Sequence, residues 1–78
     1  MRSVDRSSRT PPWRQIADVL RGEITQYGPD DRLPSVTEVA QAWGVNRKTA
    51  NKALRALADE GLIEVEPGMG YYVRPDVS

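Results

Sequence analysis

The sequence predicts a small α+β domain, mainly α-helical, in which three helices precede a two-stranded β-hairpin. Two observations support this prediction. Between residues 12 and 60, apolar residues recur at three- and four-residue steps in three segments, which is the spacing of one buried helix face. After residue 61, strand-favouring residues flank the glycine-rich stretch Pro67-Gly68-Met69-Gly70, which is typical of a hairpin. A chain of 78 residues has room for one such domain, which we place at residues 12–74.

The first helix is predicted from Pro12 to about Tyr27. Proline suits an opening turn because its missing amide proton is not needed there. Gly28-Pro29 is expected to end the helix. The loop of residues 28–34 has a single apolar residue, Leu33, which we expect to enter the core as a short strand beside the hairpin. One apolar stripe runs along the helix and is expected to be core, and its members are Trp13, Ile16, Ala17, Leu20, Ile24 and Tyr27.

The second helix is predicted from Ser35 to about Trp43. Ser35 and Glu38 form the capping-box pattern S-x-x-E, in which each side chain accepts a hydrogen bond from the other residue's amide. Gly44 suits the left-handed conformation that ends a helix. Ser35 and Thr37 lie where free amides and the positive end of the helix dipole favour a phosphate. Ser35 therefore has two open roles, to cap the helix and to bind a phosphate.

The third helix is predicted from Asn46, a favourable N-cap, to about Glu60, just before Gly61. No acidic residue lies between Glu38 and Asp59. At roughly 100° per residue, an arc of about 140° is cationic or amide-bearing and holds Arg47, Lys48, Asn51, Lys52 and Arg55. A separate arc of about 100° is apolar and holds Ala50, Ala53, Leu54 and Leu57. Such a helix packs on a core and offers a polyanion a rigid row of donors; the alternative is an ordinary solvated face.

The composition argues against several classes of function. Cysteine and histidine are both absent, which removes thiolate metal sites, disulfides and the commonest general base. We therefore expect no metal, no cofactor and no enzymatic activity. No apolar run approaches the ~20 residues that span a bilayer, and the first residues lack an apolar signal segment, so we expect no membrane contact and a cytoplasmic location. The formal net charge is zero, but the bases cluster in the third helix, which creates one positive surface.

Both ends of the chain are predicted to lie outside the domain. Residues 1–11 are polar and rich in arginine and serine, so we predict a disordered arm. Its bases Arg2, Arg6 and Arg9 either contact DNA phosphate or a minor groove, or belong to a solubilising tail. Residues 75–78 are predicted to form a short tail.

Several short stretches between Trp13 and Val73 are specific in their order and spacing, and they are Asp31-Arg32-Leu33-Pro34-Ser35, Glu38-Val39-Ala40, Gly44-Val45-Asn46-Arg47-Lys48-Thr49, Ala53-Leu54-Arg55-Ala56-Leu57, Glu60-Gly61-Leu62-Ile63, and Gly68-Met69-Gly70 with Tyr72-Val73. With these stretches, the sequence resembles the winged helix-turn-helix DNA-binding domain of the GntR family of bacterial transcriptional regulators. Asn51 followed by Lys52-Ala53-Leu54 resembles the HutC-type branch of that family.

The resemblance implies a sequence-specific transcriptional regulator, a repressor, that binds double-stranded DNA. Two copies would bind a palindromic operator, as a homodimer on the DNA, because half-sites mirror the symmetry of the protein. The helix at about 46–60 would enter the major groove, and the hairpin at 64–73, the wing, would lie at the minor groove. The family's effector-binding domain is not represented, so the chain is either an excised domain or a small standalone regulator. In either case we expect no small-molecule effector to be bound by this chain.

The resemblance also implies roles for single residues. Arg47 matches an arginine that reads a base or holds a phosphate, and Thr49 and Ser35 match residues close to the DNA backbone. Gly68 and Gly70 match the glycines of the family's wing, whose bend lets the tip approach the minor groove. Lys48, Asn51 and Lys52 are added from helical geometry. The candidate DNA-binding residues are Ser35, Thr37, Asn46, Arg47, Lys48, Thr49, Asn51, Lys52, Gly68, Met69 and Gly70.

Two departures from the family pattern affect DNA binding. Val36-Thr37 stands where Glu-Arg is usual, which removes an arginine that would bind phosphate. The wing has Met69 at its tip and Glu64 and Glu66 before it, so it has no cation to offer DNA. The acidic wing keeps an alternative open, a winged helix that contacts another protein through Met69 and an exposed Tyr71.

Overall fold

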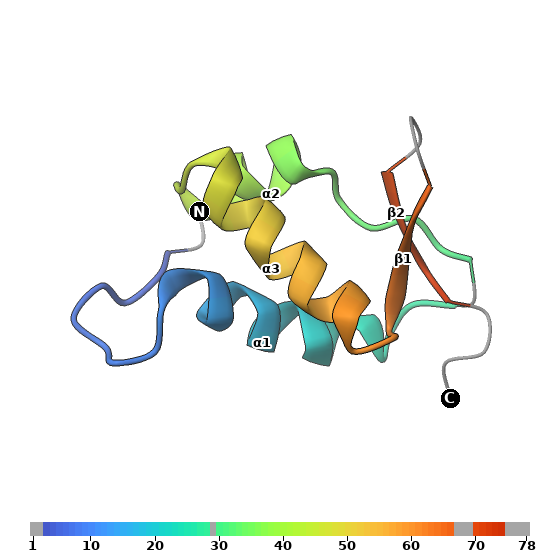
Figure 1. Cartoon of the computed structure of the whole chain (residues 1–78), viewed down its shortest axis with the longest axis horizontal. Coiled ribbons are helices and arrows are strands. Elements are labelled where there is room, and N and C mark those ends of the chain that lie inside the picture. The colour runs from blue at the N-terminus through green and yellow to red at the C-terminus, as the bar shows by residue number, and fades with distance from the viewer. Residues whose placement is uncertain (1–2, 29, 67–69, 75–78) are drawn as a thin grey trace.

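The computed structural model describes residues 3–28, 30–66 and 70–74. Within these residues the chain forms α1 (Pro12–Ile24), α2 (Val36–Trp43), α3 (Arg47–Asp59), β1 (Ile63–Glu66) and β2 (Gly70–Val73). Figure 1 shows α3 crossing α1 at the centre of the molecule, with α2 on the other side of α3 and the hairpin at one end. The predicted α+β fold is confirmed. None of the helices in the described ranges is long and apolar enough to cross a membrane.

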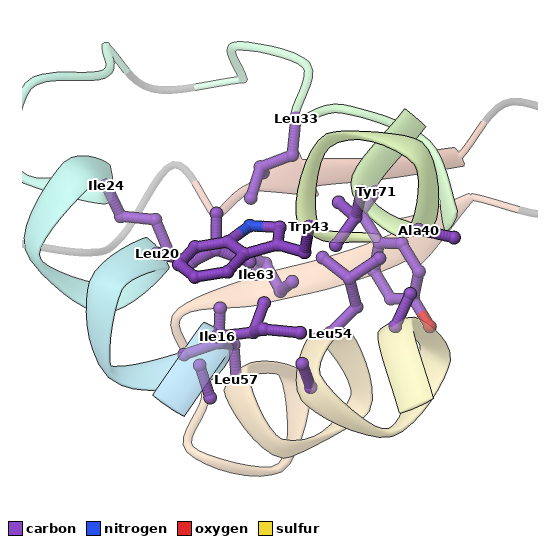
Figure 2. Close-up of a cluster of buried hydrophobic side chains, with 14 of the residues drawn as sticks. Ile16, Leu20, Ile24, Leu33, Ala40, Trp43, Leu54, Leu57, Ile63 and Tyr71 are labelled. Atoms are coloured by element: carbon purple, nitrogen blue, oxygen red, sulfur yellow. The ribbon is translucent and has the colours of Figure 1, made fainter. Parts of the chain in front are cut away.

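Helix α3 is the centre of the hydrophobic core. It contacts α1, α2 and β1. The members of its predicted apolar arc each have 0% of their surface exposed, and they are Ala50, Ala53, Leu54 and Leu57. Figure 2 shows Leu54 and Leu57 in one cluster with Ile16 from α1, Trp43 from α2 and Ile63 from β1. Because one face of α3 is fixed by this packing, the opposite, cationic face must be turned to solvent.

Helix α1 is shorter than predicted. It ends at Ile24 rather than at Tyr27, so the predicted boundary was wrong. The hydroxyl of Thr25 donates to the carbonyl of Gly22 at 2.7 Å, and the amide of Tyr27 donates to the carbonyl of Ile24 at 2.9 Å, which replaces the helix by a tighter turn. This turn still brings Tyr27 against the core. Because the apolar spacing continues to Tyr27, past the end of the helix, the sequence pattern predicted a helix that was too long.

Helices α2 and α3 begin as predicted. The Ser35 hydroxyl accepts from the Glu38 amide at 3.1 Å, and the Glu38 carboxylate accepts from the Ser35 amide at 3.0 Å, so the capping box is complete. The hydrogen bond from the Ser35 amide to the carboxylate and, after it, the interaction of the Ser35 hydroxyl with the carboxylate hold the pKa of the Glu38 carboxyl below its ordinary value. Gly44 ends α2 with φ of 65°, in the left-handed region. The side chain of Asn46 caps α3 by accepting from the Thr49 amide at 2.9 Å.

The hairpin has a third, short neighbour in the preceding loop. Strands β1 and β2 pair antiparallel, with Ile63 opposite Val73 and Glu66 opposite Gly70. Beside β2, Leu33 donates its amide to the Tyr71 carbonyl at 2.9 Å, and Arg32 forms an isolated antiparallel bridge with Tyr72. Leu33 is 3% exposed. The prediction of a buried Leu33 in a short strand beside the hairpin is therefore confirmed.

Tyr71 contradicts the expectation of an exposed anchor. Its surface is only 7% exposed, because Tyr71 and Val73 share the face of β2 that packs on the core, whereas Tyr72 points to the other face. Two adjacent tyrosines satisfy either register, so the sequence alone did not fix which one is buried. Met69, the second anchor of that hypothesis, lies outside the described residues, as does Gly68.

The segment before α1, for which the sequence predicts disorder, lies against the helix in its described part. The side-chain amide of Gln15 donates to the carbonyls of Asp5 and Thr10, each at 2.8 Å, and its oxygen accepts from the Asp5 amide at 2.7 Å. Val4 packs against the core. Arg6 and Arg9 are exposed, whereas Arg2 and residues 75–78 lie outside the described ranges.

Candidate nucleic-acid interface

The solvent face of α3 carries the cationic arc that the sequence predicts. Arg47, Lys48, Lys52 and Arg55 are exposed, and Asn51 is half-buried at the edge of the arc. Thr49, also half-buried, lies in the first turn of the same helix. The cations of this arc form no ion pair with another described residue; ion pairs elsewhere include those of Arg21 with Asp18 and Glu60. These cations are therefore available to an anion without the cost of breaking an internal pair.

Lys52 has a partner of another kind. Its ammonium lies 5.0 Å from the ring centroid of Trp13, at the start of α1, which is the geometry of a cation–π interaction. An exposed interaction of this kind contributes about 0.5–1 kcal/mol and limits the rotamers of the lysine. Trp13 and Lys52, with Lys48 and Arg55, line a shallow hollow of about 390 Å³ between α1 and α3. The sequence placed Trp13 only in the core and missed this contact, which joins residues far apart in the chain.

Asn51 is connected to the hairpin. The Tyr71 hydroxyl donates to the side-chain oxygen of Asn51 at 3.4 Å, a long hydrogen bond. Because that oxygen is the acceptor, the amide nitrogen of Asn51 is the part left to donate outward. The contact also fixes the hairpin against α3. It depends on the burial of Tyr71 and was therefore not predicted.

The start of α2 offers backbone donors. The Glu38 amide is used by the capping box and the Val39 amide donates to the Ser35 carbonyl at 2.9 Å. The amides of Val36 and Thr37 precede them in the first turn, where an α-helix has no internal acceptors. Thr37 is exposed and Ser35 is half-buried. Ser35 thus caps the helix, and the neighbouring amides point to the same end as the helix dipole.

The described part of the wing, β1 and β2, differs from α3 in charge. Glu64 and Glu66 are exposed on β1, and the described wing strands carry no basic side chain. Gly70 has φ of 108°, a conformation that favours glycine. Of the three predicted wing residues, the structure describes Gly70, at the start of β2. Gly68 and Met69 lie outside the described residues.

No cluster of three or more histidine, cysteine, aspartate or glutamate side chains suited to a metal ion occurs among the residues that the structure describes. The described residues also contain no buried charged or polar side chain. The exterior offers cationic side chains, amides and a helix N-terminus, which are groups that bind phosphate.

Comparisons with known proteins agree with this architecture. A family model described as "Bacterial regulatory proteins, gntR family" matches residues 12–73. An uncharacterised HTH-type transcriptional regulator of Rhizobium meliloti is 42% identical over 86% of this chain and 28% of its own length. The histidine utilization repressor of Klebsiella aerogenes is 36% identical over 87% of this chain and 29% of its own length. The chain thus spans less than a third of these two relatives.

Solved structures show the same arrangement of helices and hairpin. YtrA from Sulfolobus acidocaldarius, a GntR-family transcription factor, superposes with a TM-score of 0.83 at 42% identity and covers 95% of this chain and 80% of that chain. AraR(DBD), solved in complex with operator ORX1, superposes with a TM-score of 0.85 at 26% identity and covers 94% of this chain and 95% of that chain. On the family match over residues 12–73, this chain belongs to the GntR family of bacterial regulatory proteins.

Proposed function

We propose that this chain binds double-stranded operator DNA and regulates transcription as a repressor, with α3 in the major groove. The observation that carries the proposal is the unpaired cationic arc of α3 on a helix whose other face is completely buried. A rigid helix with this charge fits the width of a major groove and the spacing of phosphates beside it. The likeness to AraR(DBD), whose structure holds an operator, supports a role in operator binding.

The residues of α3 divide into base-reading and phosphate-binding groups. Arg47, in the first turn, is proposed to contact a guanine edge, because a guanidinium donates two hydrogen bonds to O6 and N7. Asn51, one turn later, is proposed to contact an adenine edge, because its amide nitrogen donates to N7 and its oxygen accepts from the N6 amino group. Lys48, Thr49 and Lys52 are proposed to hold phosphates and so to fix the register of the helix. Asn46 caps α3 through its oxygen and leaves its amide nitrogen available to DNA.

The start of α2 and the wing are proposed to make the flanking contacts. The amides of Val36 and Thr37, with the Thr37 hydroxyl, would bind one phosphate at the positive end of the helix dipole. Ser35 supports this site by holding the turn in place. The wing glycines Gly68 and Gly70, with Met69 between them, would bring the backbone close to the minor groove.

The wider setting follows from the same reasoning. Two copies are proposed to bind a palindromic operator as a homodimer on DNA, in the bacterial cytoplasm. Asn51 and the likeness to the histidine utilization repressor support a place in the HutC-type branch. We propose neither an enzymatic activity nor a cofactor, and no effector bound by this chain. The burial of Tyr71 removes one of the two anchors of the protein-contact alternative, which we therefore do not favour.

A selection experiment tests the proposal. The chain is incubated with a random duplex library, and the bound duplexes are sequenced to obtain a preferred half-site. Arg47→Ala is expected to weaken binding to that duplex by about 1–3 kcal/mol and to relax the preference at one base position. Arg14→Ala, which removes an exposed arginine from the first turn of α1, is the matched control and should leave both unchanged. Equal enrichment of all sequences, or unchanged preference in Arg47→Ala, would reject the proposal.

A further inference from the structure

The described wing strands have no cation of their own, yet a guanidinium lies against them. Arg32, from the loop before α2, extends over Gly70, and a Cβ placed on Gly70 would lie 3.6 Å from Arg32 Nε and 3.9 Å from Nη2. These are ordinary contact distances, so the guanidinium rests on the bare backbone of the glycine.

The backbone of the preceding loop explains this position. Asp31, Arg32 and Leu33 run antiparallel beside β2, with Leu33 bonded to Tyr71 and the Val73 amide donating to the Asp31 carbonyl at 2.9 Å. Side chains alternate along such a segment. Leu33 enters the core at 3% exposure, so Arg32 stands on the outer face, where it is exposed. Its cross-strand neighbour there is Tyr72, and Gly70 is the next residue of β2 on the same face.

The guanidinium of Arg32 forms no ion pair with another described residue. Glu64 and Glu66 share its face, opposite Tyr72 and Gly70 in the strand register, but neither forms an ion pair with it. Its positive charge contributes, as a minor cause, to the lowered pKa of Glu38 in the first turn of α2. Arg32 therefore lies between the first turn of α2 and the end of the hairpin where Glu66 pairs with Gly70.

We propose that Arg32 is the wing's missing cation, and that its guanidinium binds a DNA phosphate at the edge between the wing and the start of α2. This inference rests on the proposed DNA-binding function. The carboxylates of Glu64 and Glu66 repel phosphate along β1, and the exposed acids Asp30 and Asp31 precede Arg32 on its own segment. A phosphate is therefore proposed to approach Arg32 from the side of Gly70 and the first turn of α2. Arg74, the other basic residue near the hairpin, follows Val73 and so lies at the opposite end of β2 from Gly70 and Arg32.

Salt dependence of binding tests the proposal. Fluorescence anisotropy is measured for the whole chain and its preferred duplex over a series of NaCl concentrations. Arg32→Ala is expected to weaken binding about threefold to tenfold and to reduce the slope of log K against log salt by about 0.9, the value for one lost phosphate contact. Arg32→Lys keeps the charge and should keep the slope. Arg14→Ala, an exposed arginine in the first turn of α1, should match wild type, and thermal unfolding verifies that each variant is folded.

A second measurement locates the phosphate. Single phosphates of the duplex are replaced by neutral methylphosphonates, and the loss of affinity is compared for wild type and Arg32→Ala. One replacement beside the minor groove should weaken wild type but not the variant. The role of Arg32 would be overturned if Arg32→Ala left the salt slope unchanged, or if every methylphosphonate weakened the variant as much as wild type. In that case a loss of base preference in Arg47→Ala would still support the proposed function. If wild type shows no salt-dependent binding, both proposals fail.

Discussion

Helix α3 and the wing are adjacent in space but are built in opposite ways. On α3, one face is completely buried and the other carries the cationic arc, with one acid, Asp59, at the C-terminal end of the helix. The fold therefore fixes where these charges lie. The described wing strands have one buried and one acidic face, and the side chain that could offer a charge to DNA comes from the neighbouring loop. In the function proposed here, the surface of α3 recognises the DNA, whereas the hairpin contributes the shape of its backbone and the neighbouring Arg32.

The largest difference between the two regions is expected in stability. Leu54→Ala opens a cavity in the fully buried face of α3 and should lower the free energy of unfolding by about 2–5 kcal/mol. Val65→Ala, at a β1 side chain that is 57% exposed, should change it by about 0.5 kcal/mol or less. Urea denaturation measures both. Equal effects would mean that the hairpin, and not α3, holds the core together.

The cap of α2 is expected to have a smaller effect that depends on pH. Ser35→Ala removes the hydroxyl that accepts from the Glu38 amide and should cost about 1 kcal/mol at neutral pH, whereas the hydrogen bond from the amide of residue 35 to the Glu38 carboxylate remains. Because the folded-state pKa of Glu38 lies below its ordinary value of 4.5, the carboxylate's contribution is present above that value and is lost as the pH falls through the folded pKa. The difference in stability between wild type and Glu38→Ala, which lacks the carboxylate, should therefore narrow in acid. A difference that stays constant down to about pH 3 would show that the carboxylate does not contribute.

The charge of the wing is expected to affect DNA binding modestly. Glu64→Gln removes a repulsive carboxylate from β1, and Glu64→Lys adds a cation at the same exposed position. We expect the lysine variant to bind the preferred duplex about threefold more tightly than wild type and to increase the salt slope, with the glutamine variant between them. Anisotropy titrations at two salt concentrations measure this series. Three identical affinities would place the outer face of the wing away from the DNA.

The smallest effect is expected at the contact between the two regions. Tyr71→Phe deletes the hydroxyl that donates to Asn51 at 3.4 Å and should reduce stability by about 0.5 kcal/mol, since the bond is long. Tyr72→Phe, on the outer face of β2, is the matched control and should be neutral. Denaturant unfolding compares the two. A larger loss in Tyr72→Phe would indicate that the wing is held by its outer face.

Local signals in the sequence predicted most of the fold. The two arcs of α3, the capping box at Ser35, the N-cap at Asn46 and the left-handed Gly44 each depend on residues within one or two turns of one another. For that reason the fold and the cationic face of α3 could be predicted together. The end of α1 could not, because Tyr27 keeps the helical spacing from within a turn.

Contacts between distant residues were not predictable in the same way. Lys52 with Trp13, Asn51 with Tyr71, and Arg32 with Gly70 each join segments whose distance is decided by packing and strand register. The choice of Tyr71 over Tyr72 for the core is a register decision that two equal side chains cannot encode. The parts of the candidate interface that remain predictions are therefore the individual DNA contacts, not the helix that carries them.

The central claim, that α3 is the DNA-binding surface, is tested most directly by an amide-shift titration of the labelled chain with its preferred duplex at two salt concentrations. We predict shifts at residues 46–52, at the start of α2 from Ser35 to Thr37, and at Arg32 and Gly68–Gly70, all weaker at the higher salt. Shifts confined to the hairpin, or none at the lower salt with either the preferred or a mixed-sequence duplex, would contradict the claim.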